Sequence, residues 1–524
     1  MQPRAKLAFK VAGVAAASLL AILFLASIEI SRHLKDLVPA WLAQHYNGTV
    51  QLDGFHASMA FPFVLCNAEN VTVQFKGRED LPPMIAIRKL TLRASIWELL
   101  RNPVRIASVR LEGLQLNIPP HDERGNSRGI VNFGRRTREV RFGEIRADGT
   151  VLKILTQKPG RSPLEFDIRE LQLSSTDPEG ALEFRAQLSN PTPPGEITSA
   201  GVFGPWNLDT PSETPVRGTY RFENADLGVF RGIAGILSST GKYQGVLDKI
   251  SAQGTTDTPD FHVTRAGHPV DLQTTFDATI DGTDGNTYLH PVEARVGRTS
   301  FLCQGKVEHK EGVPGKDVVL DVRIENGRIE DLLLLAVKEQ PPMTGPVRLQ
   351  TNFELGPGPK NILDRLHLDG SFGLNSIHFT GSGVQQRVDN MSKRSEGKPH
   401  EVILPSQATS QDDVASELKG GFRLKDDVLT LTAVQFEIPG AALEISGTYA
   451  LEPEELELHG TIRMQAALSQ TTTGFKSVLL RLANPFFSKN GRTVLPIRVT
   501  GTVQHPHYSL DLRHKEEKEA DRGK

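Results

Sequence analysis

Residues 417–465 read ELKGGFRLKDDVLTLTAVQFEIPGAALEISGTYALEPEELELHGTIRMQ, and this stretch decides the fold class. Apolar and polar side chains alternate in the runs Leu443–Tyr449 and Leu456–Ile462. Successive side chains on a strand point to opposite faces, so a period of two gives one apolar face and one charged face. The turn-forming pairs Pro439-Gly440 and Glu452-Pro453 separate the runs. We therefore predict a meander of antiparallel strands here.

The same alternation recurs through most of the chain. Clear examples are Ile85–Arg93, Val104–Ile118, Val347–Leu355 and Leu495–Val503. Glycine (47 residues) and proline (33 residues) are frequent and aromatic residues make up only 6%, which suits a turn-rich β protein. We predict a mostly β fold, an elongated antiparallel sheet of roughly 25 to 30 strands of ordinary length, with a few short helices.

Five segments have the pattern of short helices. Ser95 and Glu98 have the spacing of a capping box, in which the side chain of each residue accepts a hydrogen bond from the backbone N–H of the other. Asp226 is placed to cap a second helix. The five predicted helices are Ser95–Leu100, the run beginning at Asp226 and ending near Ser238, Ile329–Val337, Val384–Met391 and Gly474–Asn484.

The N-terminus has the pattern of a membrane anchor. Residues 1–10 carry three basic side chains and no acidic one, and residues 11–28 contain no charge. Eighteen residues of helix cross most of a bilayer. A cleaved signal peptide is the alternative, but no small-x-small cleavage site follows the apolar run. We expect the anchor to be retained, the N-terminus to be cytoplasmic and the rest of the chain to lie outside the cytoplasm.

At 524 residues the chain is too long for one ordinary compact core. The proline-rich loop Asn190–Glu213 is the clearest candidate boundary. We predict a cytoplasmic leader and transmembrane anchor over residues 1–30, an N-terminal β region over 31–217, a C-terminal β region over 218–512 with a polar insertion at 375–416, and a disordered charged tail over 513–524.

Composition and motifs exclude several function classes. The formal net charge is −2, which gives no footprint for nucleic-acid binding. No metal, phosphate or dinucleotide motif and no catalytic constellation is present, so we expect neither an enzyme nor a cofactor. His505-Pro506-His507 has no third ligand nearby, and Asp281–Asn286 departs from a calcium loop, so we interpret both as turns.

The two cysteines, Cys66 and Cys303, lie in apolar strand-like contexts and match no metal-ligand spacing. Buried free thiols are one interpretation. A disulfide bridge between them, in an oxidising compartment, is the other.

The apolar stripe on the strands has two interpretations. It is either the core of closed sandwiches or barrels, or the inner face of an open trough that meets lipid acyl chains. Alternation alone fits both. The residues that we expect to share this face are Val347, Leu349, Phe353, Leu443, Ile445, Tyr449, Leu456, Leu458, Ile462, Ile497 and Val499.

The chain resembles the AsmA family of bacterial envelope proteins, which are relatives of TamB and of the repeating-β-groove lipid-transfer proteins. The resemblance rests on the N-terminal anchor, LTLRASIWELLRNPVRIASVRLEGLQLNI (90–118), NADLGVFRGIAGILSSTGKYQGVL (224–247), VQQRVDNMSKRSEGKP (384–399), GGFRLKDDVLTLTAVQFEIPGAALEISGTYAL (420–451), and GFKSVLLRLANPFF followed by LPIRVTGTVQHPHYSLDL (474–512). It covers nearly the whole chain and is densest after residue 218. At 524 residues the chain is shorter than the largest members of the family.

The resemblance implies that both β regions are AsmA-like. It also implies a bacterial inner-membrane anchor, a periplasmic sheet folded lengthwise into a taco-like β-groove, and phospholipid movement toward the outer membrane. We therefore expect a phospholipid-binding or phospholipid-transfer protein whose partners are membrane lipids and outer-membrane or periplasmic proteins. The alternative is an assembly factor for outer-membrane proteins that acts through an exposed sheet edge.

Overall fold

The computed structural model describes most of the chain between residues 48 and 511. The described residues are 48–60, 62–75, 81–99, 104–118, 140–155, 164–175, 181–205, 210–282, 285–310, 313, 315–398, 414, 416–467, 470, 488–489, 492–502 and 505–511. The predicted anchor, the predicted helix Gly474–Asn484 and the predicted tail lie outside these ranges. Within them, no helix is long and apolar enough to span a bilayer.

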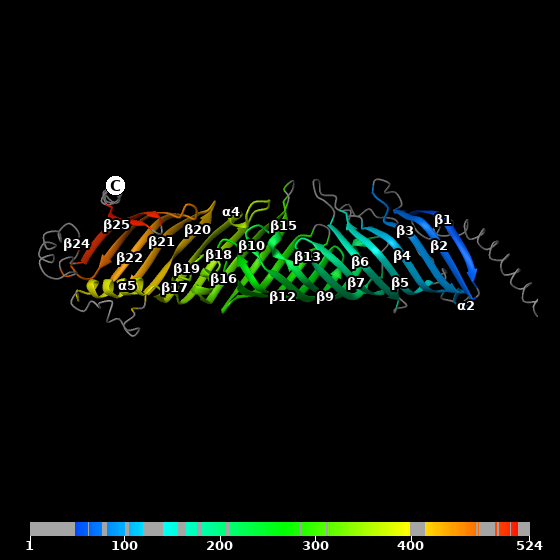
Figure 1. Cartoon of the computed structure of the whole chain (residues 1–524), viewed down its shortest axis with the longest axis horizontal. Helices are drawn as coiled ribbons and strands as arrows, with labels where there is room; N and C mark the ends of the chain where they lie inside the picture. The colour runs from blue at the N-terminus through cyan, green and yellow to red at the C-terminus, as the bar shows by residue number, and fades with distance from the viewer. Residues whose placement is uncertain are drawn as a thin grey trace, which may run out of the picture. The chain divides into compact units, whose positions relative to one another are not determined.

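The mostly β prediction is confirmed. The described residues form 26 strands and a few short helices, and the helix α5 is the longest of these at 14 residues. The strands build curled, predominantly antiparallel sheet, which Figure 1 shows as a series of twisted ribbons. Residue contacts divide the chain into two units, and we describe each by itself.

The first unit comprises Met1–Ala225, Ser238–Gly254 and Thr279–Asn286. Its strands are β1 Gly48–Ala60, β2 Phe63–Phe75, β3 Ile85–Ser95, β4 Val104–Ile118, β5 Val140–Ile154, β6 Leu164–Ser175, β7 Leu182–Pro191, β8 Pro194–Phe203 and β9 Pro215–Asp226, with most of β11 Ile236–Val246 and the start of β12 Lys249–Val263. Neighbours from β1 to β9 pair in sequence order. All of these pairs are antiparallel except β4–β5, which is parallel from Val104↔Val140 to Ile118↔Ile154.

The second unit comprises Asp226–Leu237, Thr255–Ala278 and Thr287–Lys524. Its elements are β10 Ile233–Ala234, the end of β12, most of β13 Val270–Asp281, β14 Thr287–Val296, β15 Thr299–His309, β16 Lys316–Arg328, α3 Ile329–Leu333, β17 Met343–Thr344, β18 Pro346–Leu355, α4 Ile362–Arg365, β19 Leu366–Phe379, α5 Ser382–Ser395, β20 Ser416–Lys425, β21 Val428–Ile438, β22 Ala441–Ala450, β23 Glu455–Met464, β24 Ser488–Lys489, β25 Arg492–Thr502 and β26 Pro506–Leu510. From β14 to β26 the long strands pair antiparallel in chain order.

Two predicted domain boundaries fall on β-strands. The change between residues 217 and 218 falls inside β9. The predicted proline-rich loop Asn190–Glu213 contains the whole of β8, which forms a hairpin with β7 through the facing pair Pro191↔Pro194. In the predicted polar insertion 375–416, β19 continues to Phe379 and α5 follows it.

Two of the predicted helices are confirmed. Helix α2 spans Ile96–Leu99, and the Ser95 backbone N–H donates to Glu98 Oε2 at 3.2 Å, as a capping box requires. Helix α5 encloses the predicted Val384–Met391.

The helix predicted after Asp226 was wrong. Asp226 does cap, since its Oδ1 accepts from the Gly228 N–H, but only a single 3₁₀ turn follows, η2 Leu227–Val229. The strand β11 begins soon afterwards at Ile236. Gly232 and Gly235 adopt positive φ of 110° and 142°, which ends the helical course, and the Gly235 carbonyl accepts from the Leu227 N–H.

Two carboxylates lock the short helix α3 onto the sheet. Asp331 Oδ2 accepts from the Arg298 N–H and from Thr299 Oγ1, each at 3.0 Å. Glu330 accepts from Arg298, from Arg328 and from the Gly345 N–H. Both carboxylates are nearly buried, and several donors satisfy each one. This arrangement anchors α3 to the turn between β14 and β15.

We predict that Asp331→Ala loosens this attachment. It removes the acceptor of the part-buried Arg298 N–H and one of the two acceptors of the buried Thr299 hydroxyl, which also donates to the Arg328 carbonyl. An unsatisfied donor costs about 1–3 kcal/mol. Hydrogen exchange should show faster exchange of the amides of Arg298 and Thr299, with β26 unchanged. Asp321→Ala, at an exposed position of β16, is the matched control and should leave all of these rates as they are. Unchanged protection in Asp331→Ala would contradict the anchoring role.

Candidate functional site

Strand register places the eleven predicted face residues on one side of the second unit's sheet. Directly opposed residues of paired strands point to the same face, so a chain of such pairs defines a row across the sheet. The longest row runs from β14 to β25 through Leu289, Gly305, Leu320, Phe353, Leu368, Leu424, Leu429, Tyr449, Leu456 and Gly501. Phe353, Tyr449 and Leu456 of the predicted set lie on it. Figure 1 shows the strands that carry this row, β15 to β25, in order from green to red.

Three neighbouring rows hold the other eight. Leu458 and Val499 follow Phe422, Leu431 and Gly447 in the second row. The third row contains Leu349 and Phe372 and, beyond a bulge, Ile445 and Ile497. The fourth row is Val347, Leu374, Leu418, Phe436, Leu443, Ile462 and Leu495. We call these four rows the apolar face of the second unit.

The opposite face of the same strands carries charge. Arg463 pairs with Glu444 at 2.9 Å, Arg498 with Glu457 at 2.7 Å and Arg423 with Asp369 at 2.6 Å. These side chains remain largely exposed, so each pair contributes only about 0–1 kcal/mol. The charged face therefore remains hydrated and needs no second layer of helices or strands to cover it.

Most of the apolar face is only half-buried. Val347 and Val499 are 2% and 8% exposed, whereas the other nine predicted residues have intermediate exposure. The well-covered part lies at one end of the strands, where Val347, Leu374 and Ile377 form a small core with side chains of α3 and β17. A sandwich core would bury the whole face, so the exposure pattern favours an open face in the described residues.

A loop between β12 and β13 approaches the other end of these strands. Arg265 forms ion pairs with Glu452 and Asp427, which lie in the turns β22–β23 and β20–β21. The pKa of Tyr449, on the longest row, is raised mainly by burial and also by Glu454, and the positive charge of Arg265 partly offsets this. The loop thus lies beside the end of the apolar face, and nothing in the sequence pattern predicted this contact.

The first unit has its own apolar face. Its core is Val109, Leu111, Leu114, Ala147, Ile168, Leu171 and Ala186. Along one row, Leu111, Ala147, Leu171 and Ala186 face one another from β4 to β7. The face residues expected from the sequence include none of these, although the strand β4 that begins the row has the same alternation as β23.

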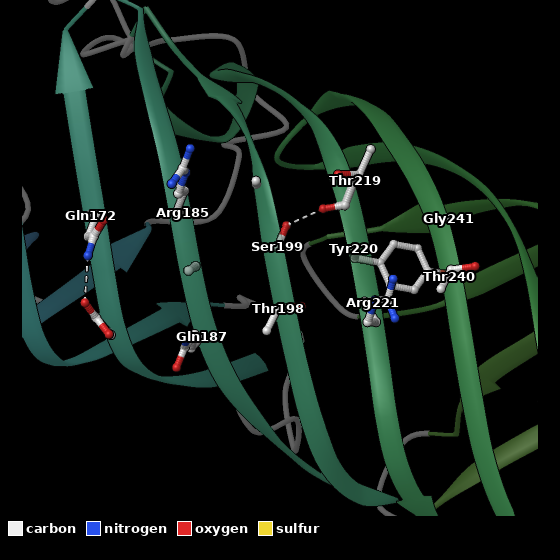
Figure 2. Close-up of a pocket in the computed structure, with 13 residues that line it drawn as sticks. Gln172, Arg185, Gln187, Thr198, Ser199, Thr219, Tyr220, Arg221, Thr240 and Gly241 are labelled. Atoms are coloured by element: carbon white, nitrogen blue, oxygen red, sulfur yellow. Dashed lines mark hydrogen bonds between the residues drawn. The ribbon is translucent and has the colours of Figure 1, made fainter.

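A shallow hollow of about 630 Å³ lies over β6 to β11 in the first unit. Gln172, Arg185, Gln187, Thr198 and Arg221 line it, and Figure 2 shows these polar side chains on neighbouring strands. The Gln172 amide donates to Glu170 Oε1 at 2.7 Å. Ala186, Ala200 and Tyr220 also line the hollow, so it offers hydrogen bonds together with some apolar surface.

The described residues include both cysteines and the two ends of the turn Asp281–Asn286. No three His, Cys, Asp or Glu side chains among them gather closely enough to hold a metal ion. Cys66 and Cys303 are free thiols, so the bridge between them is not formed. Burial raises the pKa of each thiol, which keeps both protonated near neutral pH. At Asp281–Asn286, the Asp281 N–H donates to the Asn286 carbonyl, as in a turn.

Comparisons with protein-family models, with curated proteins and with solved structures give no match to this chain.

We predict that thiol labelling distinguishes an open face from a closed core. In a chain whose two cysteines are replaced by serine, Leu458→Cys should react with a water-soluble maleimide in the native state, because Leu458 is half-exposed. Ile377→Cys should be protected, because Ile377 is fully buried. Ser446→Cys, exposed on the charged face, gives the rate of an open site. Equal protection at positions 458 and 377 would show that the face is covered.

Proposed function

We propose that this chain is a membrane-anchored, non-enzymatic protein that binds phospholipids by their acyl chains and transfers them between the inner and outer membranes of a bacterial envelope. The observation that carries the proposal is the apolar row from Leu289 to Leu456, which only Gly305 interrupts. Most of its side chains are half-buried, and the other face of the sheet is charged.

The dimensions of the row suit an acyl chain. At ~4.8 Å per strand, the row from β14 to β25 is on the order of 40 Å long. One leaflet of a bilayer has a hydrocarbon depth of ~15 Å, half of the ~30 Å core. An acyl chain therefore fits along the row with length to spare.

The energetics suit transfer. Each CH₂ of an acyl chain gains about 0.8 kcal/mol on leaving water for an apolar surface. A half-open face recovers only part of that, so bound lipid remains exchangeable. Since neighbouring rows present similar aliphatic groups, a chain that slides along them meets no large barrier.

The resemblance to the AsmA family supports the envelope setting. In that setting the chain is a single-pass inner-membrane protein with a cytoplasmic N-terminus and a periplasmic body, and it supports outer-membrane homeostasis. The basic leader and the uncharged run at residues 11–28 are the sequence features behind this placement.

A second candidate function is the assembly of outer-membrane proteins through a sheet edge. The last strand β26 favours it, because Tyr508 and Leu510 are 76% and 49% exposed on a five-residue strand. A strand from another protein could pair with such a strand. Tyr508→Ser with Leu510→Ser would then abolish capture of the partner protein. Because these two side chains oppose Val499 and Ile497 of the apolar face, lipid content is measured in the same variant.

We predict that Leu458→Asp removes most bound phospholipid from the full chain purified from cells. The new carboxylate lies in the second row of the apolar face, where it repels an acyl chain, and its partial exposure allows it to stay hydrated. Folding should be retained, as judged by circular dichroism, while lipid measured by native mass spectrometry falls several-fold.

Ser446→Asp is the control for this experiment. It adds the same charge one strand away on the charged face and should leave the lipid content as in wild type. A folded Leu458→Asp protein with wild-type lipid content would refute lipid binding at this face. An insoluble one would place Leu458 in a closed core, because an unpaired buried carboxylate costs several kcal/mol.

We also predict that the chain after residue 60 lies outside the cytoplasm. A reporter enzyme that works only outside the cytoplasm should be active when it is fused after residue 60, and one that works only in the cytoplasm should be inactive. N-terminal sequencing of the mature chain should begin upstream of residue 11, because the anchor is retained. A sequence that starts near residue 29 would show cleavage, and a reporter active only in the cytoplasm would reverse the orientation.

A further inference from the structure

The apolar face of the first unit changes character between β7 and β9. The row Leu171, Ala186 continues as Ser199 and Tyr220, and the row Leu173, Phe184 continues as Gly201 and Gly218. In these two rows, apolar side chains thus give way to hydroxyl groups and glycines within two strands, while the flanking row Leu188, Ile197 and Phe222 stays apolar.

Two tyrosine side chains lie over glycines of neighbouring strands. A Cβ at Gly241 would lie 2.7 Å from Tyr220 Cε1, and one at Gly254 would lie 2.9 Å from the Tyr220 hydroxyl. A Cβ at Gly218 would lie 2.9 Å from the Tyr243 hydroxyl. A Cβ at Gly241, Gly254 or Gly218 would also lie 2.4, 2.5 or 2.6 Å from a backbone carbonyl oxygen of the neighbouring strand. These positions therefore favour glycine, and the tyrosine side chains lie over them. Figure 2 shows the Tyr220 ring extending toward the strand that carries Gly241.

Each tyrosine hydroxyl meets a serine hydroxyl. Tyr220 Oη lies 3.0 Å from Ser239 Oγ, and Tyr243 Oη lies 2.8 Å from Ser199 Oγ. Ser199 Oγ also donates to the Thr219 carbonyl at 2.9 Å, which Figure 2 marks. Because Ser199 has only one proton, Tyr243 must be the donor in the Tyr243–Ser199 pair.

Both phenols remain donors at any physiological pH. Burial raises the pKa of Tyr220 and of Tyr243, and the serine hydrogen bonds offset this only in part. If Tyr243 turned its proton to another acceptor, Ser199 would still have its bond to the Thr219 carbonyl. Tyr243 can therefore donate its hydrogen bond to a ligand without leaving the Ser199 hydroxyl unsatisfied.

We propose that Ser199, Tyr220, Ser239 and Tyr243 form a hydroxyl waist on the apolar face of the first unit that binds the ester carbonyls of a diacyl lipid. This rests on the proposed lipid-binding function and deepens it by naming the part of the lipid that is recognised. Acyl chains lie on the aliphatic rows of β4 to β7, and the ester carbonyls accept from the tyrosine hydroxyls beyond them.

The test compares two lipids that differ only in their carbonyls. Full-length protein in detergent is incubated with vesicles of dioleoyl phosphatidylglycerol or of its dialkyl ether analogue, and retained lipid is measured by mass spectrometry. Wild type should retain the ester lipid roughly fivefold more, the ratio that one hydrogen bond of ordinary strength gives. The Tyr220→Phe, Tyr243→Phe double variant keeps both rings over their glycines. It should lose the preference while retaining as much ether lipid as wild type.

Tyr288→Phe is the matched control, since its hydroxyl bonds Glu308 on the charged face of the second unit. It should keep the full preference for the ester lipid. Equal retention of the two lipids by wild type, or a preference that survives in the double variant, would overturn the waist and leave lipid binding intact. Retention of neither lipid by wild type would overturn the proposed function, and the waist with it.

Discussion

Cross-strand register is the constraint on which the rest of this structure depends. Side chains alternate with a period of two, so a slip of one residue would move every apolar side chain of a strand to the hydrated face. The pair Leu458↔Val499 and the pair Glu457↔Thr500 exist together, and neither can be changed alone. Because each strand must match both of its neighbours, the row from Leu289 to Leu456 depends on eight consecutive strand pairs that keep this register. The separation of an apolar from a charged face follows from them.

Bulges supply the curvature that this regularity would otherwise prevent. Register shifts occur between Leu374 and Ile377 on β19 and between Leu431 and Val434 on β21. Ser376 and Ala433 adopt positive φ of 51° and 48° at these places, an uncommon conformation for residues other than glycine. An extra residue on one strand bends it and increases its twist. The sheet can thus curl while the rows on either side of each bulge stay aligned.

Alternation predicted the strands well because it is a local signal. The bounds expected for Val104–Ile118 agree with β4, and the eleven face residues lie on one side because each was read from a clear period of two. Contacts between distant segments could not be predicted in this way. Arg265 meets Glu452 at a separation of 187 residues, and the pairing of Tyr243 with Ser199 needs three strands to be placed at once. The helix expected after Asp226 does not form, for a related reason. Its cap was predicted correctly, but Gly232 and Gly235 change the direction of the chain, and the residues beyond them belong to β10 and β11.

The parallel pairing of β4 with β5 has a consequence for how the chain folds. Every other neighbouring pair from β1 to β9 is antiparallel. In the parallel pair β4–β5, facing residues are 36 positions apart in the chain at every point from Val104↔Val140 to Ile118↔Ile154. Closing that longer loop costs more chain entropy than closing a hairpin. The meander β1–β4 and the strands from β5 onward can each assemble from local contacts, so this seam should form late. During synthesis on the ribosome, the meander β1–β4 would form first as an intermediate, and one edge of β4 would stay unpaired until β5 has been made.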